Sequence, residues 1–158
     1  DSLMRLPLVW RPAPSRAVQP SVVSEPVGLL DLAPTFCRIA GLPVPEWMDG
    51  EPLPTSPADA AAQGRQRVLT EWDSVHPGGA EVHLQTITRD GLVCTRYEPG
   101  TCQDGTEGEL WDLAEDPLQL VNLWDDPTRR SLRDDLVGDL VDALPERPRT
   151  PLGLEAPV

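Results

Sequence analysis

The chain has 158 residues, and its 19 prolines and 12 glycines mean that about a fifth of it interrupts regular structure. Leucine, valine, isoleucine and phenylalanine make up about a quarter of the chain, which is above the level typical of natural disorder, and the length allows one domain of modest size. The chain has 26 acidic residues and 13 basic ones, all arginine, so its net charge of −13 excludes a protein that binds nucleic-acid phosphates. No apolar run reaches the ~18 residues of a membrane-spanning helix.

Two regular elements are predicted near the start of the chain. The first is a short strand over Leu6–Trp10, where bulky apolar residues precede a proline-rich stretch. The second is a helix over Leu29–Ala40, whose apolar residues recur at helical spacing. Asp31 is placed to cap this helix, Pro34 falls in its first turn, and Gly41 provides the stop.

An antiparallel sheet is predicted in the middle of the chain. Residues 42–66 are rich in proline and are expected to form a long surface loop anchored by Trp47 and Met48. Asp90-Gly91 is a strong signal for a two-residue hairpin. The four predicted strands are Arg67–Trp72, Val82–Arg89, Leu92–Tyr97 and Glu109–Leu113.

The last predicted element is a helix that packs on the sheet. Asp126 is expected to cap it and Pro127 to occupy its first position. Its apolar stripe consists of Leu132, Leu136, Val137, Leu140, Val141 and Leu144. After Pro145 the tail is expected to run extended over another surface, so the chain divides into residues 1–66, 67–144 and 145–158.

The scarce residue types give no complete active site. His83 falls within a predicted strand and is interpreted as an ordinary strand-face histidine, whereas His76 falls in the predicted loop over 73–79. The carboxylate clusters at 112–116 and 125–126 are explained by turns and caps beside prolines. Cys94 and Cys102 are close enough in sequence for a disulfide, but three free thiols are favoured, and no metal-ligand spacing exists.

Three blocks of the sequence resemble those of the sulfatase family. Asp31–Thr35 followed by Ala40–Pro43 resembles the block D-L-x-P-T and then A-G-x-P. Glu109–Leu123 resembles E-L-Y-D-L-x-x-D-P-x-E-x-x-N-L, with Trp111 for the usual tyrosine and Gln119 for the usual acidic residue. Arg5–Leu8 resembles the R-V-P-L segment, so the three blocks occur in the family's order.

This resemblance implies an arylsulfatase-like member of the alkaline-phosphatase-like superfamily. In that family a large N-terminal α/β domain holds calcium and a formylglycine made from C/S-x-P-x-R, and these segments precede the R-V-P-L block. The chain is therefore expected to be a C-terminal portion: the end of the α/β domain, then a small antiparallel sheet packed with a C-terminal helix. No residue of the chain matches the family's catalytic or metal-binding roles.

The resemblance also implies partners. The expected partners are the missing N-terminal catalytic domain and a small-molecule sulfate ester. Neither a nucleic acid nor a membrane is expected as a partner. The few cysteines favour a cytoplasmic location. Trp72, Asp73 and His76 are the candidates for the rim of the substrate cleft, since they offer a stacking surface, a carboxylate and a titratable donor. Two alternatives stay open: a phosphonate monoester or phosphodiester hydrolase of the same superfamily, and a binding module with no catalytic role.

Overall fold

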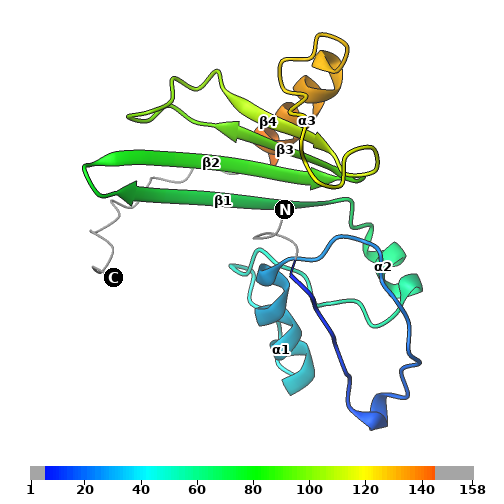
Figure 1. Cartoon of the computed structure of the whole chain (residues 1–158). Helices are drawn as coiled ribbons and strands as arrows, with labels where there is room; N and C mark the ends of the chain where they lie inside the picture. Colours follow the sequence, from blue (N-terminus) through cyan, green and yellow to red (C-terminus); the bar gives the residue numbers. More distant parts are fainter. Residues whose placement is uncertain (1–5, 145–158) are drawn as a thin grey trace. The chain divides into compact units, whose positions relative to one another are not determined.

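The computed structural model describes residues 6–144 and divides the chain into two compact units, Asp1–Val68 and Leu69–Val158. The described part of the first unit is mostly loop with short helices, and the second unit is a sheet with one long helix (Figure 1). Within the described residues, no helix is long and apolar enough to cross a membrane.

The predicted helix near the start of the chain is confirmed, with an altered first turn. A 3₁₀ turn at Leu29–Asp31 leads into α1 (Leu32–Ala40), and a separate 3₁₀ turn lies at Pro14–Arg16. Gly41 ends α1 as predicted: it has a φ of 70°, and its N–H donates to the Arg38 carbonyl. Such a left-handed conformation suits glycine at a helix end.

Three predictions for the first unit are wrong. Leu6–Trp10 forms no strand, because no partner strand pairs with it among the described residues. The expected loop contains a helix, α2 (Pro57–Gln63), which Ser56 caps by accepting a hydrogen bond from the Asp59 N–H. Trp47 is exposed and does not anchor this segment, whereas Leu53 and Ala60, the latter on α2, are buried.

The four predicted strands form one antiparallel sheet in the order β1-β2-β3-β4. The strands are β1 (Arg67–His76), β2 (Ala80–Arg89), β3 (Leu92–Tyr97) and β4 (Gly108–Asp112). Asp90 and Gly91 form the predicted hairpin turn with positive φ angles of 54° and 78°. Ile87 pairs with Cys94, and Cys94 pairs with Leu110, so these three apolar side chains lie on one sheet face.

Helix α3 (Arg130–Ala143) covers that face (Figure 1). Leu136 and Leu140 of α3 are fully buried against the sheet residues of the core. The helix begins later than predicted, because Asp126 caps a separate turn by accepting from the N–H and the hydroxyl of Thr128. The predicted extended tail, residues 145–158, lies outside the described residues.

An ion pair also holds α3 to the sheet. Arg89, the last residue of β2, donates to Asp139 at 2.7 Å and also to Asp135, one turn earlier on α3. These two carboxylates raise the pKa of the Arg89 guanidinium. The contact therefore fixes the rotation of the helix on the sheet, because both acceptors must face β2 at once.

The outer edge of β4 is occupied by a side chain. The Leu110 N–H donates to Asn122 Oδ1 at 3.0 Å, and Asn122 Nδ2 donates to the Gly108 carbonyl at 3.0 Å. The Leu123 N–H then donates to the Leu110 carbonyl at 2.9 Å. Both backbone groups of Leu110 and the carbonyl of Gly108 are thus paired within the chain on this edge.

The three cysteines are free, as favoured by the sequence analysis. Burial in the core raises the pKa of the Cys94 thiol to about 11.

The Cys94 thiol ionises at lower pH in the unfolded chain than in the folded one, so the free energy of unfolding is expected to fall by about 2–3 kcal/mol between pH 9 and about 11. Urea denaturation at pH 8, 9.5 and 10.5 measures this loss. The Cys94→Ala variant should be less stable at pH 8 but should lose less stability over this range, and equal slopes would contradict the assignment.

Candidate functional site

The three residues proposed for a cleft rim all lie on β1 but do not form one cluster. Successive side chains of a strand point to opposite faces, so Trp72 and His76 share one face and Asp73 lies on the other. Trp72 is 58% exposed. His76 Nε2 lies 3.2 Å from the hydroxyl of the buried Ser74, on the same face.

The prediction that His76 lies in a loop is wrong. It is the last residue of β1, and the turn is confined to the next three residues. Gly78 and Gly79 have φ angles of 96° and 81°, and the Gly79 N–H donates to the His76 carbonyl at 3.0 Å. A proline followed by a glycine with positive φ makes a tight turn. Because this turn needs only residues 77–79, β1 extends as far as His76.

His83, interpreted from the sequence as an ordinary strand residue, is the partner of Asp73. His83 Nδ1 lies 2.6 Å from Asp73 Oδ1, and Nε2 lies 3.9 Å from Glu81 Oε2. The ring is nearly buried and has carboxylates at both nitrogens. A carboxylate that accepts from Nδ1–H fixes the orientation of the ring and the nitrogen that can exchange a proton. A hairpin register centred on Gly78, with residues 77–79 as the turn, would have placed Asp73 opposite His83.

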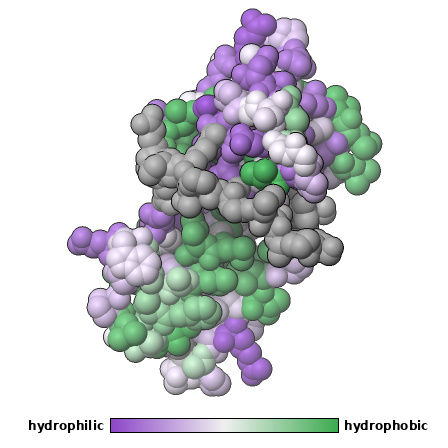
Figure 2. Space-filling view, turned by 90° about the vertical axis from the view of Figure 1, so that its left-hand side faces the viewer, coloured by the Kyte–Doolittle hydropathy of each residue, from purple (hydrophilic) through white to green (hydrophobic). Residues whose placement is uncertain are grey.

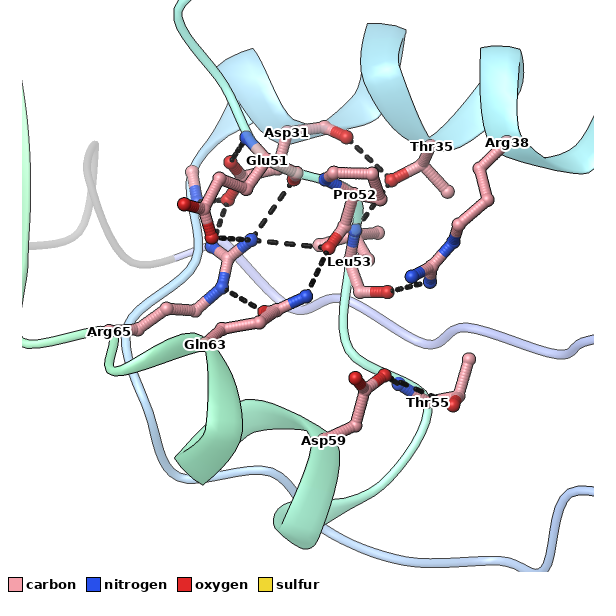
Figure 3. Close-up of polar contacts among 11 residues, drawn as sticks. Asp31, Thr35, Arg38, Glu51, Pro52, Leu53, Thr55, Asp59, Gln63 and Arg65 are labelled. Atoms are coloured by element: carbon pink, nitrogen blue, oxygen red, sulfur yellow. Dashed lines mark hydrogen bonds and ion pairs between the residues drawn. The ribbon is translucent and has the colours of Figure 1, made fainter. Parts of the chain in front are cut away.

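A second polar cluster lies in the first unit around Asp31 (Figure 3). Its carboxylate accepts from the Gly28 N–H at 2.8 Å, from the Glu51 N–H at 3.0 Å and from Arg65 Nη1 at 2.7 Å. The Asp31 and Arg65 side chains are only 10% and 9% exposed. The prediction that Asp31 caps α1 through its side chain is therefore wrong. The side chain instead joins three separate segments of the first unit.

The same cluster explains Thr35 and Arg38. The Thr35 hydroxyl donates to the Asp31 carbonyl at 2.6 Å and accepts from the Leu53 N–H at 2.7 Å, and Arg38 donates to the Leu53 carbonyl. Figure 3 shows these side chains projecting from α1 toward the segment around Leu53. The D-L-x-P-T block thus holds the chain around residues 51–53 against α1, which is a structural role.

The carboxylates of the last block are likewise used by the backbone. Asp112 accepts from the N–H groups of Ala114 and Glu115, and Asp116 accepts from those of Leu120 and Val121. Across residues 6–144, no three or more histidine, cysteine or acidic side chains are grouped so that they could hold a metal ion. These carboxylates serve as turn acceptors.

The apolar residues of α1 face away from its polar contacts. The buried residues of the helix are Pro34 and Thr35, whereas Phe36, Ile39 and the preceding Leu29 are largely exposed. Figure 2 shows hydrophobic side chains gathered on the surface of the unit that carries α1. A helix with an exposed apolar stripe is typical of an element that packs against a further layer of structure.

A family model described as "N-sulphoglucosamine sulphohydrolase, C-terminal" matches residues 1–145. A curated relative, the Delta 4,5-hexuronate-2-O-sulfatase of Bacteroides thetaiotaomicron, is 30% identical over 118 residues. That match covers 68% of this chain and 23% of the relative. The chain therefore spans about a quarter of the length of the curated relative that it matches.

Solved structures show the same fold. An enzyme solved in complex with its substrate D-glucosamine-2-N,6-O-disulfate matches with a TM-score of 0.55 and 18% identity, over 71% of this chain and 22% of its own. The phosphonate monoester hydrolase of Agrobacterium radiobacter matches with a TM-score of 0.57 and 23% identity, over 71% of this chain and 23% of its own. The family match over residues 1–145, together with the 30% identical curated relative, identifies the chain as a member of the sulfatase C-terminal family.

Proposed function

We propose that the chain is the C-terminal part of a hydrolase that releases sulfate from an organic sulfate ester, and that a preceding α/β domain of the same polypeptide carries out the chemistry. The observation that carries this proposal is the exposed apolar face of α1, which offers Phe36 and Ile39 to a further layer of structure. The family match and the greater length of the curated relative, of which the matched region is only 23%, support it.

The catalytic groups that the family resemblance implies, calcium and formylglycine, do not fit the described residues of this chain. The Asp31 carboxylate already accepts from two backbone N–H groups and one arginine, and those of Asp112 and Asp116 accept from turn N–H groups. No cysteine or serine of the chain begins a C/S-x-P-x-R sequence. Both groups therefore belong, in this proposal, to the preceding domain.

The test is hydrolysis by the full-length enzyme. Sulfate released from 4-nitrophenyl sulfate and from monosulfated sugars is measured by ion chromatography, with 4-nitrophenyl phenylphosphonate as the competing substrate. Sulfate release is expected to dominate. Turnover of the phosphonate ester alone would favour the alternative enzyme class, whose fold this chain shares with the Agrobacterium hydrolase. No turnover of either class would favour a binding module.

Within this function, the hairpin of β1 and β2 is proposed to form one wall of the substrate cleft. Trp72 and His76 share a sheet face and are both exposed, so they can contact a substrate together. Asp73 does not join them, and its role would be to orient His83 on the opposite face.

Replacing Trp72 or His76 by alanine in the full-length enzyme should lower kcat/KM by roughly two- to tenfold, because an aromatic contact contributes ~0.5–1.5 kcal/mol. Steady-state kinetics with the best sulfate ester measures the effect. Arg130→Ala, at an exposed position on α3, is the matched control and should leave kcat/KM unchanged. Unchanged kinetics in both hairpin variants would remove this wall from the site.

A further inference from the structure

The loop between β4 and α3 presents three apolar side chains to solvent. Leu118 and Leu120 are each 76% exposed and Val121 is 60% exposed, whereas Leu123, further along the same loop, packs on the core. We refer to Leu118, Leu120 and Val121 as the apolar loop tip. Several large apolar side chains exposed together are typical of a contact surface.

The backbone of the apolar loop tip is held in place. Asp116 Oδ2 accepts from the Leu120 N–H at 2.7 Å and from the Val121 N–H at 2.8 Å. The Gln119 N–H donates to the Asp116 carbonyl at 3.1 Å, and Gln119 has a φ of 54°. A loop fixed in this way loses little conformational entropy when its side chains enter a partner's surface. The polar residues of the block thus serve to orient the apolar ones.

Charge narrows the choice of partner. Within residues 69–144 the carboxylates outnumber the arginines by more than three to one, and Asp125 follows the apolar loop tip along the chain. Glu115, which precedes the tip, is paired with Arg129 at 2.9 Å. A second copy of this chain would bring like charge against like charge, which disfavours association. The surface that fits is an apolar pocket bordered by arginine or lysine side chains.

We propose that the apolar loop tip docks into such a pocket on the preceding domain of the same polypeptide. This inference rests on the proposed function, which supplies that domain. Its support is the length of the curated relative, of which the matched region is only 23%, so a large surface belongs to the rest of the molecule. The tip would be a second attachment point, carried by the second unit, in addition to the apolar face of α1.

Thiol labelling of the full-length protein tests the docking. The variants L118C and L120C are treated with a maleimide, and the modified site is quantified by peptide mass spectrometry. The matched control is V141C, at an apolar position on α3 that is 45% exposed. In the native protein, position 118 or 120 should react at least roughly tenfold more slowly than position 141, because a docked thiol reacts only when the contact opens. In urea the rates should become equal.

Equal rates at 118, 120 and 141 in the native protein would overturn the docking, and so would protection that disappears on dilution, which would indicate a second copy. Sulfate release by the same wild-type protein is measured separately. An active sulfatase with a freely labelled tip would overturn only this inference. A protected tip in a protein that hydrolyses no sulfate ester would overturn only the proposed function. Retained activity of L118C would show that the variant is folded.

Discussion

Replacing Arg65 by alanine is expected to lower the free energy of unfolding by about 3–5 kcal/mol, because the change leaves the Asp31 carboxylate buried without its cation. The guanidinium donates to Asp31, to the carbonyls of Glu51 and Pro52, and to the side chain of Gln63. Its side chain is only 9% exposed, so solvent screens the pair weakly. Urea denaturation followed by tryptophan fluorescence measures the loss.

Two further variants separate the ion pair from a general effect of removing an arginine. Arg11→Ala removes an exposed arginine of the same unit and should change the unfolding free energy by no more than about 0.5 kcal/mol. The double variant D31A/R65A should lose less than the sum of the two single variants, because neither charge is then left unpaired. Additive losses would show that the two side chains act independently.

Leu136→Ala should destabilise the second unit by about 2–5 kcal/mol, since it removes a large side chain from a fully buried site. Leu136 is 0% exposed and belongs to the cluster that joins α3 to Ile87 and Cys94 of the sheet. The loss combines the transfer free energy of the removed methyl groups with the cost of the cavity. Thermal unfolding followed by circular dichroism measures the change.

Val141→Ala is the control on the same helix. Val141 is 45% exposed, and alanine has the higher helix propensity, so the net change should stay within about 0.5 kcal/mol. A similar loss in both variants would mean that α3 does not pack through the face that contains Leu136 and Leu140.

Local sequence signals were sufficient for most of the second unit. The turn signal at Asp90-Gly91 and the β-forming residues of Leu92–Tyr97 specify a hairpin through neighbouring residues alone, and both were predicted correctly. Helix α2 was missed because its apolar residues are alanines, which produce no periodic stripe. Leu6–Trp10 was misassigned because its bulky residues suit a strand, whereas strand formation also requires a partner to pair with.

The two polar clusters, around Asp31 and around His83, could not be predicted from local sequence patterns. Asp31 and Arg65 are far apart in sequence and meet because the intervening chain folds back on α1, which no local pattern encodes. The pairing of Asp73 with His83 depends on hairpin register, which changes by one residue if the turn is misplaced. The rim residues were expected on the loop after the first strand, but they all lie on β1, where the alternation of faces separates Asp73 from Trp72.

The amide of Asn122 has a consequence for how the protein behaves at high concentration. An unpaired sheet edge is a template on which another chain can add a strand, and such pairing leads to aggregation. Here one side chain takes the place of the next strand by offering both an acceptor to Leu110 and a donor to Gly108. Aspartate would lack the donor. The asparagine at this position of the block thus protects the folded sheet from growing by intermolecular pairing at β4.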